Sequence, residues 1–249
     1  YEDSKLIDRY EQKIGIRTFD FDAEKGFILN DRPLKINGVC LHHDFGCLGS
    51  AFNVNAARRQ LEILKDMGCN ALRTSHNPPA PQLLDLCDEM GFIVQDEAFD
   101  MWRKRKTTYD YSRYFNEWHE RDLTDFIIRD RNHPSIFMWS IGNEVPSQWK
   151  EEGVKVAAWL QGLCHQEDST RPVTCGMDQY NSVVLNGFAE QLDIVGFNYK
   201  VDRYIPAYEL LPQRLILGSE TASTVSSRGV YHFPAAIGSA IMHDDHQSS

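Results

Sequence analysis

Short apolar runs alternate with amphipathic stretches along most of the chain, and this alternation constrains the fold more than any other feature. Segments 69–75 (CNALRTS) and 92–99 (FIVQDEAF) have the length and continuous apolar character of strands that are buried on both faces. Segment 79–91 (PAPQLLDLCDEMG) begins with prolines and ends at a glycine, as helices commonly do. Strands that are each followed by a helix are typical of a parallel sheet covered by helices.

Seven strand segments of this kind occur between Pro33 and Glu220. Seven strand-helix units in about 190 residues favour a (β/α)₈ TIM barrel, an α/β fold, over an open doubly wound sheet. No GxGxxG motif follows the first predicted strand, which removes the main support for a dinucleotide-binding fold. The predicted strands are 34–41, 69–75, 92–99, 135–144, 172–176, 192–200 and 214–220, and the clearest predicted helices are 54–68, 79–91, 114–131 and 149–164.

The two ends of the chain depart from this alternation. Residues 1–31 contain KIGIRTFDF and GFILN around a turn, which predicts a β-hairpin without a matching helix. We therefore assign residues 1–25 to the C-terminal strands of a preceding immunoglobulin-like β-domain, and residues 26–249 to the barrel. No convincing eighth strand follows Glu220, so we expect this chain to be a truncated segment of a longer protein.

Charge and hydropathy narrow the classes of partner. The net charge of −10 and the absence of a Lys/Arg run argue against nucleic acid, because phosphate binding requires a concentrated basic surface. No apolar stretch approaches the roughly 18 residues of a membrane span, and the N-terminus is not a signal peptide. We expect a soluble protein of the cytoplasm, periplasm or exterior, with no membrane partner. The six cysteines are scattered and predicted to be reduced core thiols: Cys40, Cys47, Cys69, Cys87, Cys164 and Cys175.

A carboxylate at the end of a predicted buried strand points to chemistry. In MWSIGNEVP the strand residues run directly into Asn143 and Glu144, and an unpaired buried carboxylate costs several kcal/mol, roughly, unless it is paired, protonated or used. Active-site groups of barrels lie at the C-terminal ends of strands, and two glutamates from separate strands are what glycoside hydrolysis requires. Polar residues follow several predicted strands: His42-His43-Asp44, Arg73 to Asn77, Asp96-Glu97, Asn143-Glu144, Tyr199 and Glu220.

Four segments carry a family resemblance: GVCLHHDFGCLGSAF, MGCNALRTSHNPPAPQLLDLCDEMGFIVQDEAFDMW, RDRNHPSIFMWSIGNEVP and LILGSETAS. Together they resemble the catalytic domain of glycoside hydrolase family 2, closest to its β-galactosidases, over about residues 26–230. The resemblance implies a retaining exo-β-glycosidase that hydrolyses terminal β-D-galactosides through a covalent glycosyl-enzyme. It places the acid/base at Glu144 and the nucleophile at Glu220.

The same resemblance implies roles for neighbouring residues. Asn143 would bind the sugar 2-hydroxyl, His42 and His76 would line the sugar subsite, and Tyr199 would hydrogen-bond the nucleophile. From the residues themselves, Arg73 near the nucleophile would keep that carboxylate ionised, and Trp102 could stack on a sugar ring.

Each role has a structural alternative. Glu144 could pair with an arginine across the barrel mouth, and Glu220 could cap the Thr/Ser-rich loop that follows it. The acid/base must hold a proton, and a pocket walled by Trp139 or Trp102 would raise its pKa. The histidines, Asn143 and Tyr199 could equally be satisfied structural groups.

We predict no cofactor and no metal. Some β-galactosidases of the family bind magnesium just after the third barrel strand, but here that stretch is DEAFDMWRKRK, without a Glu-x-His and poor in oxygen ligands.

The expected ligand is a β-galactoside or a related carbohydrate. A β-glucuronidase or β-mannosidase of the same family, a non-catalytic sugar-binding barrel and homo-oligomerisation of the full-length protein all stay open. A phosphate-binding isomerase barrel is disfavoured, because LGSETASTVSSRG carries a Glu that would repel phosphate. We expect the segment alone to be inactive, since an open barrel exposes strand edges and lacks part of the sugar pocket.

Overall fold

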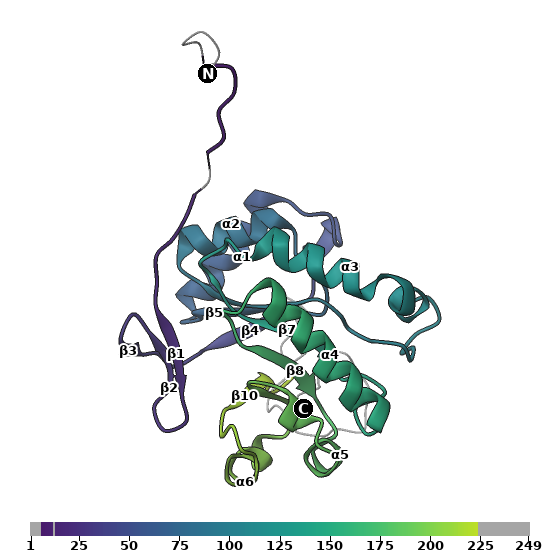
Figure 1. Ribbon diagram of the computed structural model, residues 1–249. Helices are drawn as coiled ribbons and strands as arrows, with labels where there is room; N and C mark the ends of the chain where they lie inside the picture. Colours follow the sequence, from purple (N-terminus) through teal and green to yellow (C-terminus); the bar gives the residue numbers. More distant parts are fainter. Residues whose placement is uncertain (1–5, 12, 224–249) are drawn as a thin grey trace.

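A computed structural model describes residues 6–11 and 13–223, which form an α/β body with an extended N-terminal segment (Figure 1). The main sheet has seven parallel strands in the spatial order β10-β9-β8-β7-β6-β5-β4. Its strands are β4 (Gly38–Leu41), β5 (Ala71–Thr74), β6 (Ile93–Glu97), β7 (Ile136–Asn143), β8 (Val173–Met177), β9 (Val195–Asn198) and β10 (Ile216–Glu220).

Helices follow the strands and cover the outside of the sheet. In Figure 1, α3 and α4 lie side by side, and α1 and α2 pack together next to them. The helices are α1 (Val54–Asp66), α2 (Pro81–Met90), α3 (Ser112–Asp130), α4 (Glu151–Glu167), α5 (Tyr180–Leu185) and α6 (Tyr204–Leu210), with 3₁₀ turns at Gly46–Leu48, Ala189–Gln191 and Val201–Arg203.

The sheet curls so that its first and last strands meet. The Cys40 thiol on β4 donates to the Ser219 carbonyl on β10, with 3.3 Å between Sγ and O. A sheet whose two edge strands approach in this way is a barrel rather than an open sheet, so the predicted barrel fold is confirmed. Most of the stretch expected to lack an eighth strand lies outside the described residues.

A small antiparallel sheet covers the N-terminal ends of the barrel strands. It consists of β1 (Phe19–Asp22), β2 (Gly26–Leu29) and β3 (Arg32–Pro33), and the rings of Phe21 and Phe27 pack on Phe137 at the start of β7. The domain boundary expected between residues 25 and 26 falls inside the β1–β2 hairpin. The assignment of residues 1–25 to a preceding immunoglobulin-like domain stays a prediction.

The first barrel strand begins later than expected from its apolar pattern. Residues 34–41 were one predicted strand, but β4 starts at Gly38 because Leu34 continues the small sheet, donating its N–H to the Phe27 carbonyl at 2.9 Å. The other predicted barrel strands and the four predicted helices are found within a few residues of their expected bounds.

Two simple expectations can be checked directly. All six cysteines lie within the described residues, and none forms a disulfide. Cys87, Cys164 and Cys175 are core thiols as expected, whereas Cys40 and Cys69 are partly exposed and Cys47 is exposed, so the expectation of a core position is wrong for Cys47. In the described part of the chain, no helix is both long and apolar enough to cross a bilayer.

Candidate active site

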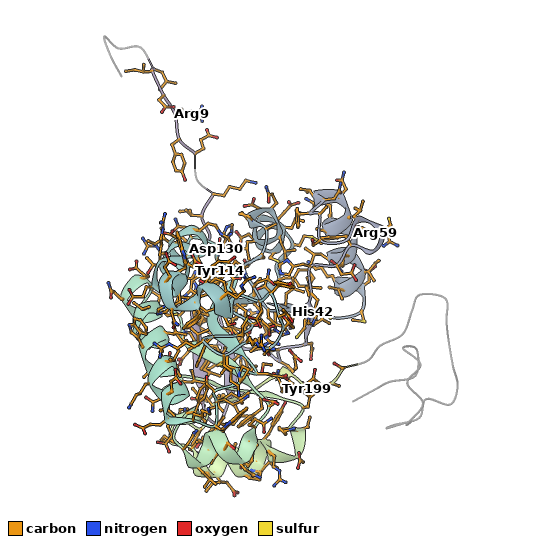
Figure 2. All side chains as sticks on the ribbon, turned by 90° about the vertical axis from the view of Figure 1, so that its right-hand side faces the viewer. Arg9, His42, Arg59, Tyr114, Asp130 and Tyr199 are labelled. Carbon is orange, nitrogen blue, oxygen red and sulfur yellow. The ribbon has the colours of Figure 1, made fainter. Side chains whose placement is uncertain are left out.

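The ends of β4, β5, β7, β9 and β10 bring most of the predicted site residues to one end of the sheet. Three residues just beyond strands have left-handed backbone: His43 (φ 54°) two residues after β4, and Glu144 (φ 41°) and Tyr199 (φ 59°) directly after β7 and β9. Such φ values are uncommon outside glycine and concentrate where a side chain is held for a function. Figure 2 shows His42 and Tyr199 on the same side of the body, away from the N-terminal segment that carries Arg9.

Arg73 on β5 is the hub of this site. Its guanidinium donates to the Glu97 carboxylate on β6 at 3.0 Å, to Glu220 Oε1 on β10 at 2.7 Å and to Asn143 Oδ1 on β7 at 2.8 Å. Burial would lower the Arg73 pKa. The negative charge of Glu97, together with smaller contributions that include Glu220, outweighs burial, so the pKa of Arg73 is raised. Arg73 is therefore a permanent cation at the centre of the barrel.

Glu220 is surrounded by donors. Its Oε2 accepts from the Tyr199 hydroxyl at 2.5 Å, its Oε1 accepts from Arg73, and His76 Nε2 lies 3.4 Å from Oε1. Burial would raise the Glu220 pKa, but the hydrogen bonds from Tyr199 and Arg73 outweigh it, so the pKa lies below its usual range. Burial and the bond to Glu220 raise the Tyr199 pKa to about 12. Glu220 is thus ionised and Tyr199 protonated at neutral pH.

Glu144 has a different environment. Its Oε1 accepts a hydrogen bond from the side-chain amide of Asn198 at 2.9 Å, and its backbone N–H donates to the Gly176 carbonyl at 2.7 Å. Within the described residues no cation forms an ion pair with Glu144, so the alternative of a structural pair with an arginine is not supported. The arginine of the site, Arg73, pairs with Glu220 instead.

The Asn143 amide is fixed by three side chains. Its Oδ1 accepts from Arg73 and from Asn198 Nδ2 at 3.0 Å, and its Nδ2 donates to Asp100 Oδ1 at 3.3 Å. Gly176 on β8 packs directly against the Arg73 and Asn143 side chains. A Cβ at this position would lie 2.8 Å from Arg73 Nη2 and 2.9 Å from Asn143 Oδ1. The close approach of these groups therefore requires glycine.

The two predicted subsite histidines are neighbours. His76 Nδ1 is 2.7 Å from Glu97 Oε1, and the His42 and His76 rings are 5.0 Å apart in an edge-to-face arrangement. Burial, and after it the proximity of His76, lowers the His42 pKa, which favours a neutral imidazole at neutral pH. Both rings are partly exposed and can meet a ligand.

Two expectations for tryptophan side chains are wrong, namely that Trp102 stacks on a sugar ring and that Trp139 forms the pocket wall beside the acid/base. Trp102 is only 1% exposed, its indole N–H donates to the Ile141 carbonyl at 2.8 Å, and its ring stacks on Phe188, so it offers no face to a sugar. Trp139 points outward from β7, where its N–H donates to Asp168 after α4 at 3.0 Å. Side chains alternate along a strand, so Ser140, not Trp139, faces the barrel interior and bonds Glu97 at 2.5 Å.

Comparison with known proteins gives the family of the chain. Residues 22–236 match the sequence profile described as "Glycosyl hydrolases family 2, TIM barrel domain". The chain belongs to this family. A relative named beta-galactosidase BoGH2A, from Bacteroides ovatus, is 50% identical over 93% of this chain and 31% of its own length. A beta-glucuronidase from Bacteroides fragilis is 33% identical over 72% of this chain and 26% of its own length.

A solved structure of a glycosyl hydrolase family 2 member shows the same fold. The protein, from Bacteroides cellulosilyticus, superposes with a TM-score of 0.84 at 44% identity, over 91% of this chain and 29% of that one. The chain thus spans about a third or less of the length of these family 2 relatives.

The residues near Glu144 do not suit the magnesium ion found in some family 2 β-galactosidases. Asp100, which binds the Asn143 amide, already accepts from the ammonium of Lys106 at 2.6 Å, and the buried side chains of Met101 and Trp102 carry no oxygen atom that could bind a hard cation. Within the described residues, the one cluster with metal-ligand spacing is Asp85, Asp88 and His133, at the opposite end of β7.

Two residues of this cluster, Glu97 and Asn198, were not among the predicted site residues. Glu97, whose side chain is fully buried, binds both Arg73 and His76, and Asn198 joins Asn143 to Glu144. Glu97 and Asn198 are each the polar last residue of a buried strand, and this pattern was the sequence signal that could have identified them. A cavity of about 520 Å³ borders the site, and His76, Pro78, Phe99, Asp100 and Tyr111 are among its lining residues.

Proposed function

We propose that the complete protein is a retaining exo-β-glycosidase that hydrolyses terminal β-D-galactosides, with Glu220 as nucleophile and Glu144 as acid/base. The observation that carries this proposal is the contrast between the two carboxyl groups. Glu220 is bound by a cation and a phenol that stabilise its ionised form, whereas Glu144 is bound by a neutral amide. Two carboxyl groups whose environments differ in this way are suited to opposite roles in one mechanism.

In the first step the Glu220 carboxylate attacks the anomeric carbon. The bond to the glycosidic oxygen breaks, and Glu144 transfers its proton to that oxygen, so the aglycone leaves as a neutral alcohol. In the second step Glu144, now a carboxylate, takes a proton from water, whose oxygen attacks the same carbon and releases Glu220. Two inversions give net retention.

The surrounding groups support this sequence. Arg73 and Tyr199 hold Glu220 ionised and oriented, which prepares the nucleophile before the substrate arrives. Asn143 Nδ2 carries a second hydrogen beside the one directed to Asp100, and we assign it to the sugar 2-hydroxyl, a contact that strengthens in an oxocarbenium-like transition state. His42 and His76 are assigned to other sugar hydroxyls.

The identity of the sugar is inferred from the named relatives. The 50% identical relative is named a β-galactosidase, which favours β-galactosides, and the 33% identical relative named a β-glucuronidase makes β-glucuronides the second candidate. Both sugars would use the same two glutamates.

A panel of aryl glycosides with one leaving group tests the proposal in the complete protein. We expect kcat/KM for the β-galactoside to exceed that for the β-glucuronide and the β-mannoside at least tenfold. If kcat/KM were instead highest for the β-glucuronide or the β-mannoside, the proposed sugar would be wrong and the proposed mechanism would stand. Binding of galactose without turnover of any glycoside would indicate a non-catalytic sugar-binding barrel and contradict the proposal.

A further inference from the structure

Lys106 reaches from the loop between β6 and α3 to the end of β7. Its Nζ lies 2.7 Å from the Asn143 carbonyl oxygen and 2.6 Å from Asp100 Oδ1, and its side chain is 22% exposed. A lysine that is held against a strand end in this way loses much of the rotamer freedom of its long side chain. The contacts it makes there must offset that cost.

The first contact fixes the peptide group between Asn143 and Glu144. The N–H of this peptide belongs to Glu144 and donates to the Gly176 carbonyl on β8, while its C=O belongs to Asn143 and accepts from Lys106. Glu144 has a φ of 41°, so the regular strand ends at this peptide. The group that joins the two central site residues is therefore held at both polar ends, one of them by Lys106.

The second contact fixes the Asn143 side chain. Asp100 Oδ1 accepts from both Lys106 Nζ and Asn143 Nδ2, so the ammonium positions the carboxylate that orients the amide. Arg73 and Asn198 bind the opposite, oxygen side of the amide. The three partners together leave one Nδ2 hydrogen without a protein acceptor among these contacts.

The loop is built to present Lys106. The backbone N–H groups of Lys106 and Thr107 both donate to Asp110 Oδ2, at 2.6 and 2.7 Å. The other oxygen of Asp110 accepts from the Ser112 hydroxyl at 2.6 Å and from its N–H at 3.1 Å, at the start of α3. The turn that carries Lys106 is thus tied to the first residues of a long helix.

We infer that Lys106 is a positioning residue of the active site, which holds the Asn143 amide and the Glu144 backbone in their working orientation through the Asn143 carbonyl and Asp100. This inference rests on the proposed function of Asn143 and Glu144. Lys106 acts through the Asn143 carbonyl and Asp100, not on the reacting atoms.

The test compares Lys106→Met, Lys106→Arg and Lys104→Met with the complete wild-type protein. Lys104 is exposed in the same loop and lies over the Trp149 ring, so it serves as the matched control. Lys106→Met should lower kcat about 10²-fold, since misplacement of a catalytic group by about 1 Å has that effect, with KM changed little. The loss should be larger for poor leaving groups, which depend on the acid, and Lys106→Arg should recover part of it.

Several outcomes would overturn the inference. These are a Lys106→Met kcat within threefold of wild type, a loss equal to that of Lys104→Met, or a loss fully accounted for by a lower melting temperature. If the wild type hydrolysed no glycoside, the proposed function alone would fail. Crystal structures would then decide: in Lys106→Met the inference predicts a rotated Asn143 amide or a Glu144 φ outside the left-handed region, and an unchanged pair would contradict it.

Discussion

The Arg73 guanidinium lies 2.7 Å from the Glu220 carboxylate, although the two residues are 147 positions apart in the chain. The same guanidinium binds Glu97 and Asn143, so one cation joins β5 to β6, β7 and β10. Glu97 and Glu220 share this single buried arginine, and the ionised state of Glu220 depends on the contact with it.

Replacing Arg73 with Met should destabilise the protein strongly. The Glu97 side chain is fully buried, and without Arg73 it keeps its contacts to Ser140 and His76 but loses its permanent cation, which costs about 3–5 kcal/mol. Urea unfolding of the complete protein would measure the loss. Arg58→Met removes an arginine from the exposed pair with Glu89 and is the matched control, for which we expect no measurable change. Similar losses in both variants would contradict the central role of Arg73.

Replacing Tyr199 with Phe should change the pH profile more than the stability. The Tyr199 hydroxyl helps to depress the Glu220 pKa, and activity requires ionised Glu220, so activity is present above that pKa and lost as pH falls through it. Without the hydroxyl the pKa rises, and the acid limb of kcat/KM should move to higher pH. Stability should fall by only about 1 kcal/mol. Tyr109→Phe, at an exposed tyrosine, should leave the limb in place, and an unmoved limb in Tyr199→Phe would argue against the contact.

Most of the fold follows from the sequence, because strands buried on both faces read as apolar runs. The strand end at Glu144 and the contact between Arg73 and Glu220 were both expected and are found. The direction of side chains just beyond a strand was harder to predict. Trp102 follows β6 but turns into the core, because the regular alternation of side chains ends with the strand and the sequence does not show which way the next ones point.

Contacts that cross a loop could not be predicted. Lys106 reaches the Asn143 carbonyl over 37 positions, and no periodicity in the sequence marks that contact. The amide of Asn198 resembles that of any strand-end asparagine until Glu144 is placed beside it.

Replacing Glu144 with Gln should affect substrates unequally. A glutamine cannot donate the proton that a poor leaving group requires, whereas an activated aryl group leaves without it. We expect kcat/KM to fall far more for an alkyl β-galactoside than for a dinitrophenyl β-galactoside. Steady-state kinetics on both substrates would show this, and equal losses would contradict the acid role.

Replacing Gly176 with Ala should displace the side chains of Arg73 and Asn143 and lower activity. The added Cβ would lie 2.8 Å from Arg73 Nη2, so the guanidinium or the strand must shift, and we expect kcat/KM to fall about 10²-fold. Gly162→Ala, where a Cβ within α4 meets nothing within 4 Å, should keep activity and gain about 0.5–1 kcal/mol of stability. Full activity in Gly176→Ala would show that the close packing over this glycine is not required.

The most direct test of the account is to identify the nucleophile in the complete protein. A 2-deoxy-2-fluoro-β-galactoside with a good leaving group should form a covalent adduct, because the fluorine slows hydrolysis of the glycosyl-enzyme more than its formation. Mass spectrometry of the digested protein should find one added sugar on the peptide that contains Glu220, and Glu220→Ala should remain unlabelled. A label on any other residue, or turnover of galactosides by Glu220→Ala at near-normal rates, would contradict the assignment of Glu220 as the nucleophile.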